Sequence, residues 1–229
     1  MRRSVISDRA GPARDADAGA RRRPAAPRDR RRRRRLAGLT AALVALAAAG
    51  AAWYQVHQEM PGWYARMWYP LEHERALREE AARNGLEPAL VAAVIEAESG
   101  FVADSRSAEG AIGLMQVQPA TARFVAGLPQ RPSPSPERLA DPETNIAYGT
   151  RFLRYLIERY GSVDMALVAY NGGPANLGRW LEQAQAEGRA LRVPDDIPFA
   201  ETRSYVREVR ESVPIYRRAY GDRLAPDAP

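Results

Sequence analysis

The sequence predicts a mainly α-helical protein in which one apolar N-terminal helix precedes a helical domain. From residue 71 onwards, apolar side chains recur three and four residues apart in one segment after another, which is the period of an α-helix. Prolines and glycines separate these segments, and no alternating pattern typical of a strand continues for more than a few residues. The 229 residues leave room for one domain of ordinary size with appendages.

The first 35 residues are strongly basic. They contain fourteen Arg and four Asp, a net charge of +10, whereas residues 36–229 contain twenty Arg and twenty-four Asp or Glu, a net charge of −4. With almost no large apolar side chain, residues 1–35 cannot offset their ordering entropy, so we expect a disordered tail. Because the folded part is acidic, we expect it to bind no nucleic acid.

Residues 36–54, "LAGLTAALVALAAAGAAWY", are uncharged and predict a membrane anchor. As a helix they would extend about 28 Å, enough to cross a hydrocarbon core. Six arginines precede this stretch, and Trp53 and Tyr54 end it, which predicts a single-pass inner-membrane protein with a cytoplasmic N-terminus and an extracytoplasmic domain. A cleaved signal peptide is the alternative, since small residues precede Trp53, but the leader is long for one.

Residues 55–70 are expected to link the anchor to the domain. Trp63, Tyr64, Trp68 and Tyr69 in this stretch fit either of two environments, the membrane interface or the surface of the domain. The sequence alone leaves both open.

Five helical segments follow, bounded by prolines in the first turn, an Asp cap and glycine stops. They are residues 70–85, ending at Gly85; 87–99, starting near Pro88; 144–161, capped by Asp141; 162–173; and 200–221, where Pro214 predicts a kink. Residues 107–121 form a glycine-containing loop that enters a helix at Pro119, and residues 127–139 form a proline-rich loop.

Glu98 lies on the apolar face of the second of these helices. Val91, Val94 and Ile95 precede it by seven, four and three residues, spacings that stack side chains along one stripe. Burial there would raise the pKa of Glu98 and keep it protonated near neutral pH, as a general acid requires. A structural carboxylate paired with a buried Arg or a helix end is the alternative. Glu96 points about 160° away, and we expect it to face water.

Five motifs in order strengthen the first interpretation, although each alone is ordinary. They are "ESGF", "SAEGAIGLMQVQPATA", "NIAYG", "AYNGGP" and "IPFAETRSYV". Together they resemble the successive motifs of the transglycosylase SLT domain, the lysozyme-like catalytic domain of bacterial lytic transglycosylases. The resemblance covers the chain from Tyr69 to Gly221, so we expect this domain at residues 71–221 and a short tail at 222–229. It implies a mainly helical fold with a saccharide-binding groove.

The resemblance also implies an activity on the glycan strands of peptidoglycan. Glu98 would be the catalytic acid that protonates the oxygen between N-acetylmuramic acid and N-acetylglucosamine, and then the base that accepts the muramoyl 6-hydroxyl proton, leaving a 1,6-anhydro end. Val102 follows "ESGF" where the family often has Asn. The residues that the resemblance places along the groove, as lining or bracing groups, are Ser107, Met115, Gln116, Tyr170, Asn171, Glu201 and Tyr205.

Two other functions remain open at this point. A lysozyme would hydrolyse the same bond with water and needs a second carboxylate roughly 5–9.5 Å from the first, for which Asp104 is the first candidate. An inactive glycan-binding scaffold would need no acid at all. One acid without an evident partner favours attack by the substrate's own hydroxyl. With no Cys and only two His, we expect neither a metal site nor a cofactor, and the sequence identifies no protein partner in the cell envelope.

Overall fold

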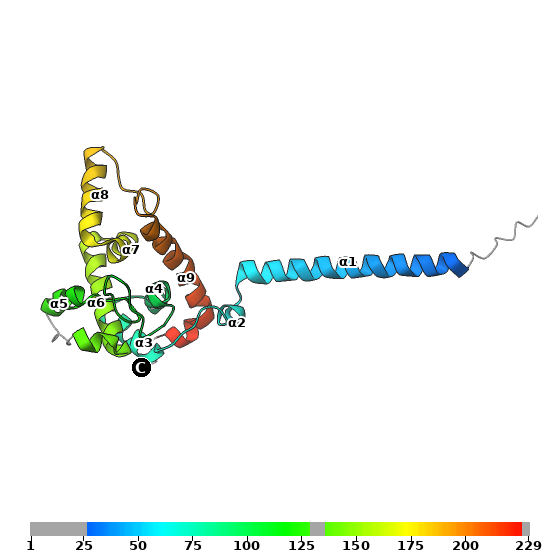
Figure 1. Cartoon of the computed structure of the whole chain (residues 1–229), viewed down its shortest axis with the longest axis horizontal. Coiled ribbons are helices and arrows are strands. Elements are labelled where there is room, and N and C mark those ends of the chain that lie inside the picture. The colour runs from blue at the N-terminus through cyan, green and yellow to red at the C-terminus, as the bar shows by residue number, and fades with distance from the viewer. Residues whose placement is uncertain (1–26, 129–135, 226–229) are drawn as a thin grey trace, which may run out of the picture. The chain divides into compact units, whose positions relative to one another are not determined.

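The computed structural model describes residues 27–128 and 136–225, and in this part of the chain the regular structure is helical (Figure 1). The mainly α fold class is thereby confirmed. Two isolated bridges, from Arg106 to Ile112 and from Ile112 to Val117, tighten the loop before α5. The helices are α1 (Pro27–Glu59), α2 (Gly62–Ala65), α3 (Glu74–Arg83), α4 (Pro88–Ser99), α5 (Pro119–Gly127), the 3₁₀ helix η1 (Pro136–Ala140), α6 (Pro142–Tyr160), α7 (Val163–Gly172), α8 (Pro174–Ala186) and α9 (Ala200–Leu224).

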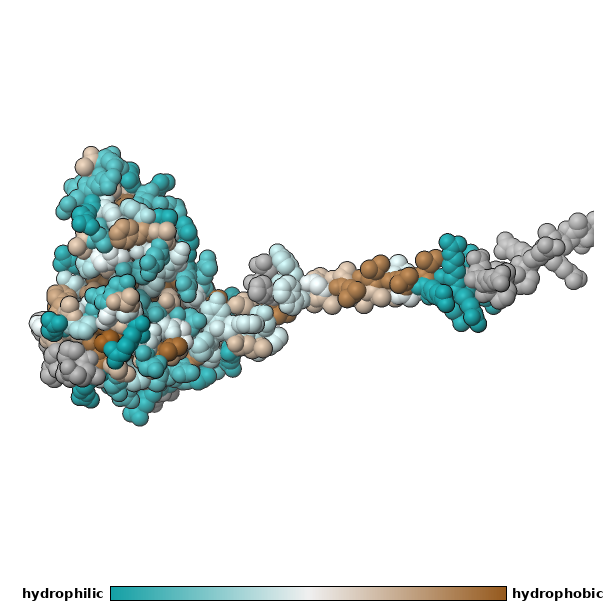
Figure 2. Space-filling view, in the orientation of Figure 1, coloured by the Kyte–Doolittle hydropathy of each residue, from teal (hydrophilic) through white to brown (hydrophobic). Residues whose placement is uncertain are grey.

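The chain divides into two units, residues 1–54 and 55–229. In the first, α1 is long and apolar enough over Arg30–Val56 to cross a membrane, a property that signal sequences share. Figure 2 shows its apolar stretch in brown after the teal arginines. Residues 27–35, which we expected to be disordered, are helical, because Arg is a good helix former and extending an existing helix costs little. Residues 1–26 lie outside the described residues.

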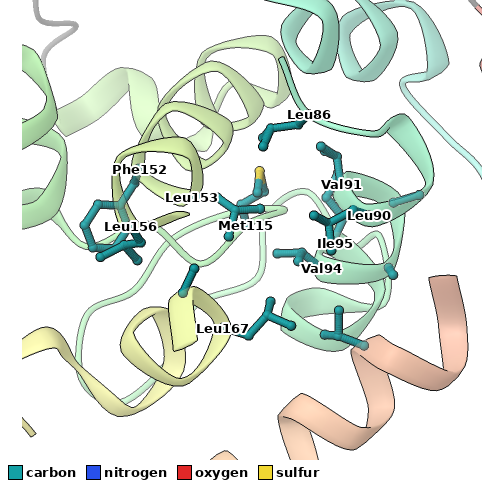
Figure 3. Packing of buried hydrophobic residues seen from close by; sticks show 14 of the residues in the cluster. Leu86, Leu90, Val91, Val94, Ile95, Met115, Phe152, Leu153, Leu156 and Leu167 are labelled. Carbon is teal, nitrogen blue, oxygen red and sulfur yellow. The ribbon is translucent and has the colours of Figure 1, made fainter. Parts of the chain in front are cut away.

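Helix α4 forms the centre of the domain. Seven consecutive residues, 89–95, are buried on all sides of the helix, as expected for a helix enclosed by neighbours. Figure 3 shows Met115 between Val91 and Val94 of α4 on one side and Leu153 of α6 on the other. The helix stops at Gly100, whose φ of 58° lies in the left-handed region.

Helix α9 packs along α4, in the most extensive contact between two helices of the described chain, and also contacts α7 and α2. The kink expected at Pro214 was wrongly placed: the non-helical backbone lies at Tyr220, with φ −136° and ψ 15°. Pro214 itself is exposed, and the helix continues past it.

Helix α8 was not expected from the sequence. It begins with Pro174 directly after Gly173 and buries Leu177, Trp180 and Ala184, which are three and four residues apart. Both the proline start and the spacing were present in the sequence. The long Asp141-capped helix is found as α6, with the Asp141 carboxylate accepting from the Thr144 N–H at 2.9 Å.

Candidate active site

Glu98 occupies the last turn of α4 and is half-buried. Burial raises the pKa of its carboxyl from 4.5 to about 7; the Tyr205 hydroxyl opposes this shift, and the negative charges of Glu201 and Glu208 add to it. Within the described part of the chain no Arg forms an ion pair with Glu98. The alternative of a carboxylate paired with a buried Arg therefore does not apply.

Tyr205 brings a buried phenol from α9 to Glu98. Burial and the nearby Glu98 charge both raise the pKa of Tyr205. Among the described residues its buried hydroxyl has no hydrogen-bond partner of standard geometry. Its contact with the Glu98 carboxyl nevertheless lowers the pKa of that carboxyl, so the hydroxyl favours the ionised form of Glu98.

Tyr170 of α7 lies close enough to Glu98 to sense its charge, and it contacts Met115. The Tyr170 hydroxyl donates to the Met115 carbonyl oxygen at 2.8 Å. Burial and the charge of Glu98 raise the pKa of Tyr170 well above its usual range, so its phenol stays neutral. Met115 itself is fully buried, and a Cβ added at Gly149 would lie 2.4 Å from its Sδ. Only glycine at 149 lets α6 approach Met115 this closely.

Asn145 fixes the loop that carries Met115, a role that sequence reasoning missed although Asn145 begins the motif "NIAYG". Its Oδ1 accepts from the Met115 N–H at 2.7 Å, and its Nδ2 donates to the Ile112 and Leu139 carbonyls at 2.7 and 2.8 Å. The side chain is fully buried. Three short bonds in a buried setting hold the loop in one conformation.

Gln116 and Ser107 brace the same loop rather than Glu98. Gln116 has a positive φ of 45°, and its Nε2 donates to the Gly113 carbonyl at 2.9 Å. The Ser107 Oγ accepts from the backbone N–H groups two and four residues later, at 3.2 and 3.3 Å. Both side chains are half-buried.

Asn171 joins the end of α7 to the start of α9. Thr202, which is 1% exposed, donates from Oγ1 to the Asn171 Oδ1 at 2.7 Å. Gly172 leaves the room this contact needs, because a Cβ there would lie 3.1 Å from the same hydroxyl. Thr202 is a second bracing residue that sequence reasoning missed. Glu201, beside it, is exposed on the first turn of α9.

The expectation that Glu96 faces water was wrong. Glu96 is half-buried, and its Oε2 lies 3.3 Å from the hydroxyl of Tyr216 on α9, which also donates to the Pro70 carbonyl at 3.0 Å. Helix α9 covers this face of α4 as well, which the period of α4 alone cannot show. Asp104, in contrast, is exposed on the turn after α4 and is not among the groups that shift the pKa of Glu98.

The profile of the family described as Transglycosylase SLT domain matches residues 75–193, more than half of the chain. The chain belongs to this family. Within the described residues of this SLT protein, no three His, Cys, Asp or Glu side chains are grouped so that they could hold a metal ion.

Relatives of this SLT chain are lytic transglycosylases. The soluble lytic murein transglycosylase of Escherichia coli is 32% identical over 157 residues, which are 68% of this chain and 24% of that protein. Membrane-bound lytic murein transglycosylase C of Yersinia pestis is 32% identical over 62% of this chain and 46% of its own length. An inactive mutant of lytic transglycosylase Slt from Pseudomonas aeruginosa, with glutamine in place of one glutamate, superimposes with a TM-score of 0.61 at 29% identity, covering 71% of this chain and 27% of that one. The chain thus spans about a quarter of the length of the Escherichia coli relative.

Proposed function

We propose that this protein is a membrane-anchored lytic transglycosylase that cleaves the β-1,4 bond between N-acetylmuramic acid and N-acetylglucosamine in peptidoglycan and leaves 1,6-anhydro ends. The observation that carries the proposal is Glu98, a half-buried carboxyl with a pKa of about 7 and two phenols beside it. Membership of the SLT family supports it, as do relatives named lytic murein transglycosylases. The related Slt enzyme is inactive as a Glu to Gln mutant.

The chemistry needs Glu98 to act twice. Protonated Glu98 gives its proton to the glycosidic oxygen as the bond from that oxygen to the muramoyl C1 breaks. The muramoyl 6-hydroxyl then attacks C1, and the Glu98 carboxylate accepts the hydroxyl proton, which restores the acid without consuming water. A pKa near the working pH suits both steps, because proton donation and acceptance are then equally accessible.

Tyr205 and Tyr170 have different parts in this proposal. The Tyr205 hydroxyl stabilises the Glu98 carboxylate that forms after proton donation, consistent with its lowering the pKa of that group. Tyr170, whose hydroxyl is already committed to Met115, acts by fixing the wall of the site. Ser107, Gln116 and the remaining groove residues keep the lining or bracing roles that the family resemblance implies.

A hydrolytic lysozyme is the second candidate, and Glu201 and Glu208 join Asp104 as candidates for its second carboxylate. Glu201 and Glu208 are the carboxylates that act on Glu98, whereas Asp104 does not. Both lie on α9 and are exposed. A two-carboxylate mechanism would need one of these two, or Asp104, at roughly 5–9.5 Å from Glu98.

Cleavage products separate the candidates. Full-length protein in detergent is incubated with purified peptidoglycan, beside Glu98→Gln and the matched control Glu96→Gln, and the released muropeptides are weighed by mass spectrometry. We expect anhydro-muramoyl products from the wild type and Glu96→Gln and none from Glu98→Gln. Products heavier by one water would establish the lysozyme, and an inactive wild type would favour the glycan-binding scaffold.

The anchor is proposed for residues 36–54, with residues 1–35 cytoplasmic, 55–70 as the link, and 71–221 as the extracytoplasmic domain of an inner-membrane protein. The apolar helix over Arg30–Val56 and the membrane-bound relative support this. Removing residues 1–54 should release an active domain into the soluble fraction. A truncated protein that stays with the membrane would contradict the anchor.

A further inference from the structure

Three large apolar side chains stand out from the domain within six residues of one another. Trp63, Met67 and Trp68 are 65%, 69% and 63% exposed, and we call them the juxtamembrane patch. The other exposed large apolar residues described in the unit 55–229 are single residues in four separate segments, at positions 102, 124, 163 and 199. Single exposed apolar residues are normal on protein surfaces, whereas a cluster marks a site of contact.

The patch does not belong to a loose linker. Ala65, between its members, is fully buried, and α2 packs on α9. The Arg66 Nε donates to the Ala219 carbonyl at 2.7 Å, and the Tyr220 hydroxyl donates to the Tyr69 carbonyl at 2.8 Å. The segment thus has two faces, one fixed on α9 and one that presents the patch.

Gly62 shows how tightly this segment is seated. A Cβ at residue 62 would lie 2.9 Å from the Arg218 carbonyl oxygen, so only glycine allows the observed approach. The Arg66 guanidinium also lies 5.4 Å from the centre of the Tyr220 ring, within the range of a cation–π contact. The exposure of the patch is therefore a property of the folded domain.

The chain itself brings this patch near a bilayer. The apolar stretch of α1 ends at Val56, and Trp63 follows seven residues later, at most about 25 Å away even if those residues were fully extended. Helix α1 continues to Glu59, which shortens this reach further. The patch is thus within reach of the headgroup region, about 5–8 Å thick on each side of the hydrocarbon core.

We propose that the juxtamembrane patch inserts into the extracytoplasmic interface of the membrane and docks the SLT domain on the bilayer instead of leaving it on a tether. This rests on the proposed anchor. Trp combines an apolar ring with a polar N–H and prefers the membrane interface. Residues 61–70 contain Arg66 and no acid, so nothing in the segment repels anionic headgroups.

The absence of Cys from the chain makes a direct test practical. Met67→Cys carries a single spin label in full-length protein reconstituted into vesicles of phosphatidylethanolamine and phosphatidylglycerol. Collision rates with oxygen, which concentrates in lipid, and with a water-soluble nickel complex are compared by electron paramagnetic resonance. Leu43→Cys in α1 is the lipid reference, and Gln185→Cys, exposed on α8, is the water reference.

We expect the oxygen-to-nickel ratio at Met67 to be several-fold higher than at Gln185 and closer to that at Leu43. Trp63→Cys, a second exposed position, should give the same result. A ratio at Met67 equal to that at Gln185, with Leu43 in lipid, would overturn the docking and leave the anchor intact. Leu43 in water would overturn the anchor and the docking together. Spin–spin broadening at Met67 without a raised oxygen ratio would show that a second copy covers the patch, and would also overturn the proposal.

Discussion

Glu96 and Glu98 lie two residues apart on α4, and both face α9. They differ in the tyrosine of α9 that each one contacts. Burial raises the pKa of both Glu96 and Glu98, and the charge of Glu208 adds to both shifts. Each also faces a tyrosine of α9, Tyr216 for Glu96 and Tyr205 for Glu98. Burial alone therefore does not distinguish a catalytic acid from a structural one.

The two tyrosines provide the distinction. The Tyr216 hydroxyl is engaged by the Pro70 carbonyl as well as by Glu96, and so ties α9 to the start of the domain. The Tyr205 hydroxyl is buried without a standard partner among the described residues. The Tyr205 hydroxyl instead acts on the Glu98 carboxyl, whose pKa it lowers, and this difference is why we propose Glu98 rather than Glu96 as the reactive acid.

The largest expected difference is between Glu98→Gln and Glu96→Gln in the rate of peptidoglycan cleavage. Loss of a general acid should lower the rate about 10²–10⁴-fold, whereas Glu96→Gln should change it by less than about threefold. Initial rates of muropeptide release measure both. Equal losses in the two variants would mean that Glu98 has no special role and that both acids act through the fold.

The second difference is in stability at alkaline pH. Since the folded-state pKa of Glu98 is raised from 4.5 to about 7, its contribution to stability is fully present below the unfolded pKa and is lost as pH rises through about 7. Glu98→Gln cannot lose a proton, so at pH 8 it should be more stable than the wild type by about 1–3 kcal/mol, and the two should converge near pH 4. Denaturant unfolding at both pH values measures this, and parallel curves would contradict the raised pKa.

The third difference concerns the pH profile of activity. Because the first step of the proposed mechanism needs protonated Glu98, kcat/KM should fall above about pH 7, approaching tenfold per pH unit. In Glu96→Gln, kcat/KM should begin to fall at the same pH, because Glu96 is not among the groups that shift the pKa of Glu98. A change in this pH in Glu96→Gln would show that the protonation of Glu96 affects that of Glu98.

The smallest expected effects separate the two tyrosines. Tyr205→Phe removes a group that lowers the pKa of Glu98, so the pH above which kcat/KM falls should move to a higher value. The variant should have about tenfold less activity and little change in stability. Tyr216→Phe should leave this pH unchanged and lose about 1 kcal/mol of stability with its hydrogen bond to Pro70. A shifted pH profile in Tyr216→Phe, together with lost stability in Tyr205→Phe, would contradict the different roles given to the two tyrosines.

Local patterns in the sequence were sufficient for most helices and for the place of Glu98. Pro88 at a helix start, the Asp141 cap and the three-to-four spacing of apolar residues act within a few residues of chain, so the sequence predicts their outcome. Glu98 follows from the same spacing, since its position on the buried face is a property of one helix. Helix α8 was missed although Pro174 and its apolar spacing were present.

Only the tertiary structure decided which segment packs against each face of a helix. The burial of Glu96 depends on α9, more than one hundred residues away in the chain. The bonds of Asn145 to Met115 and of Thr202 to Asn171 likewise join segments about thirty residues apart. The period of a helix fixes which residues share a side, but the partner on that side is chosen by packing between distant segments, which one helix's pattern does not encode.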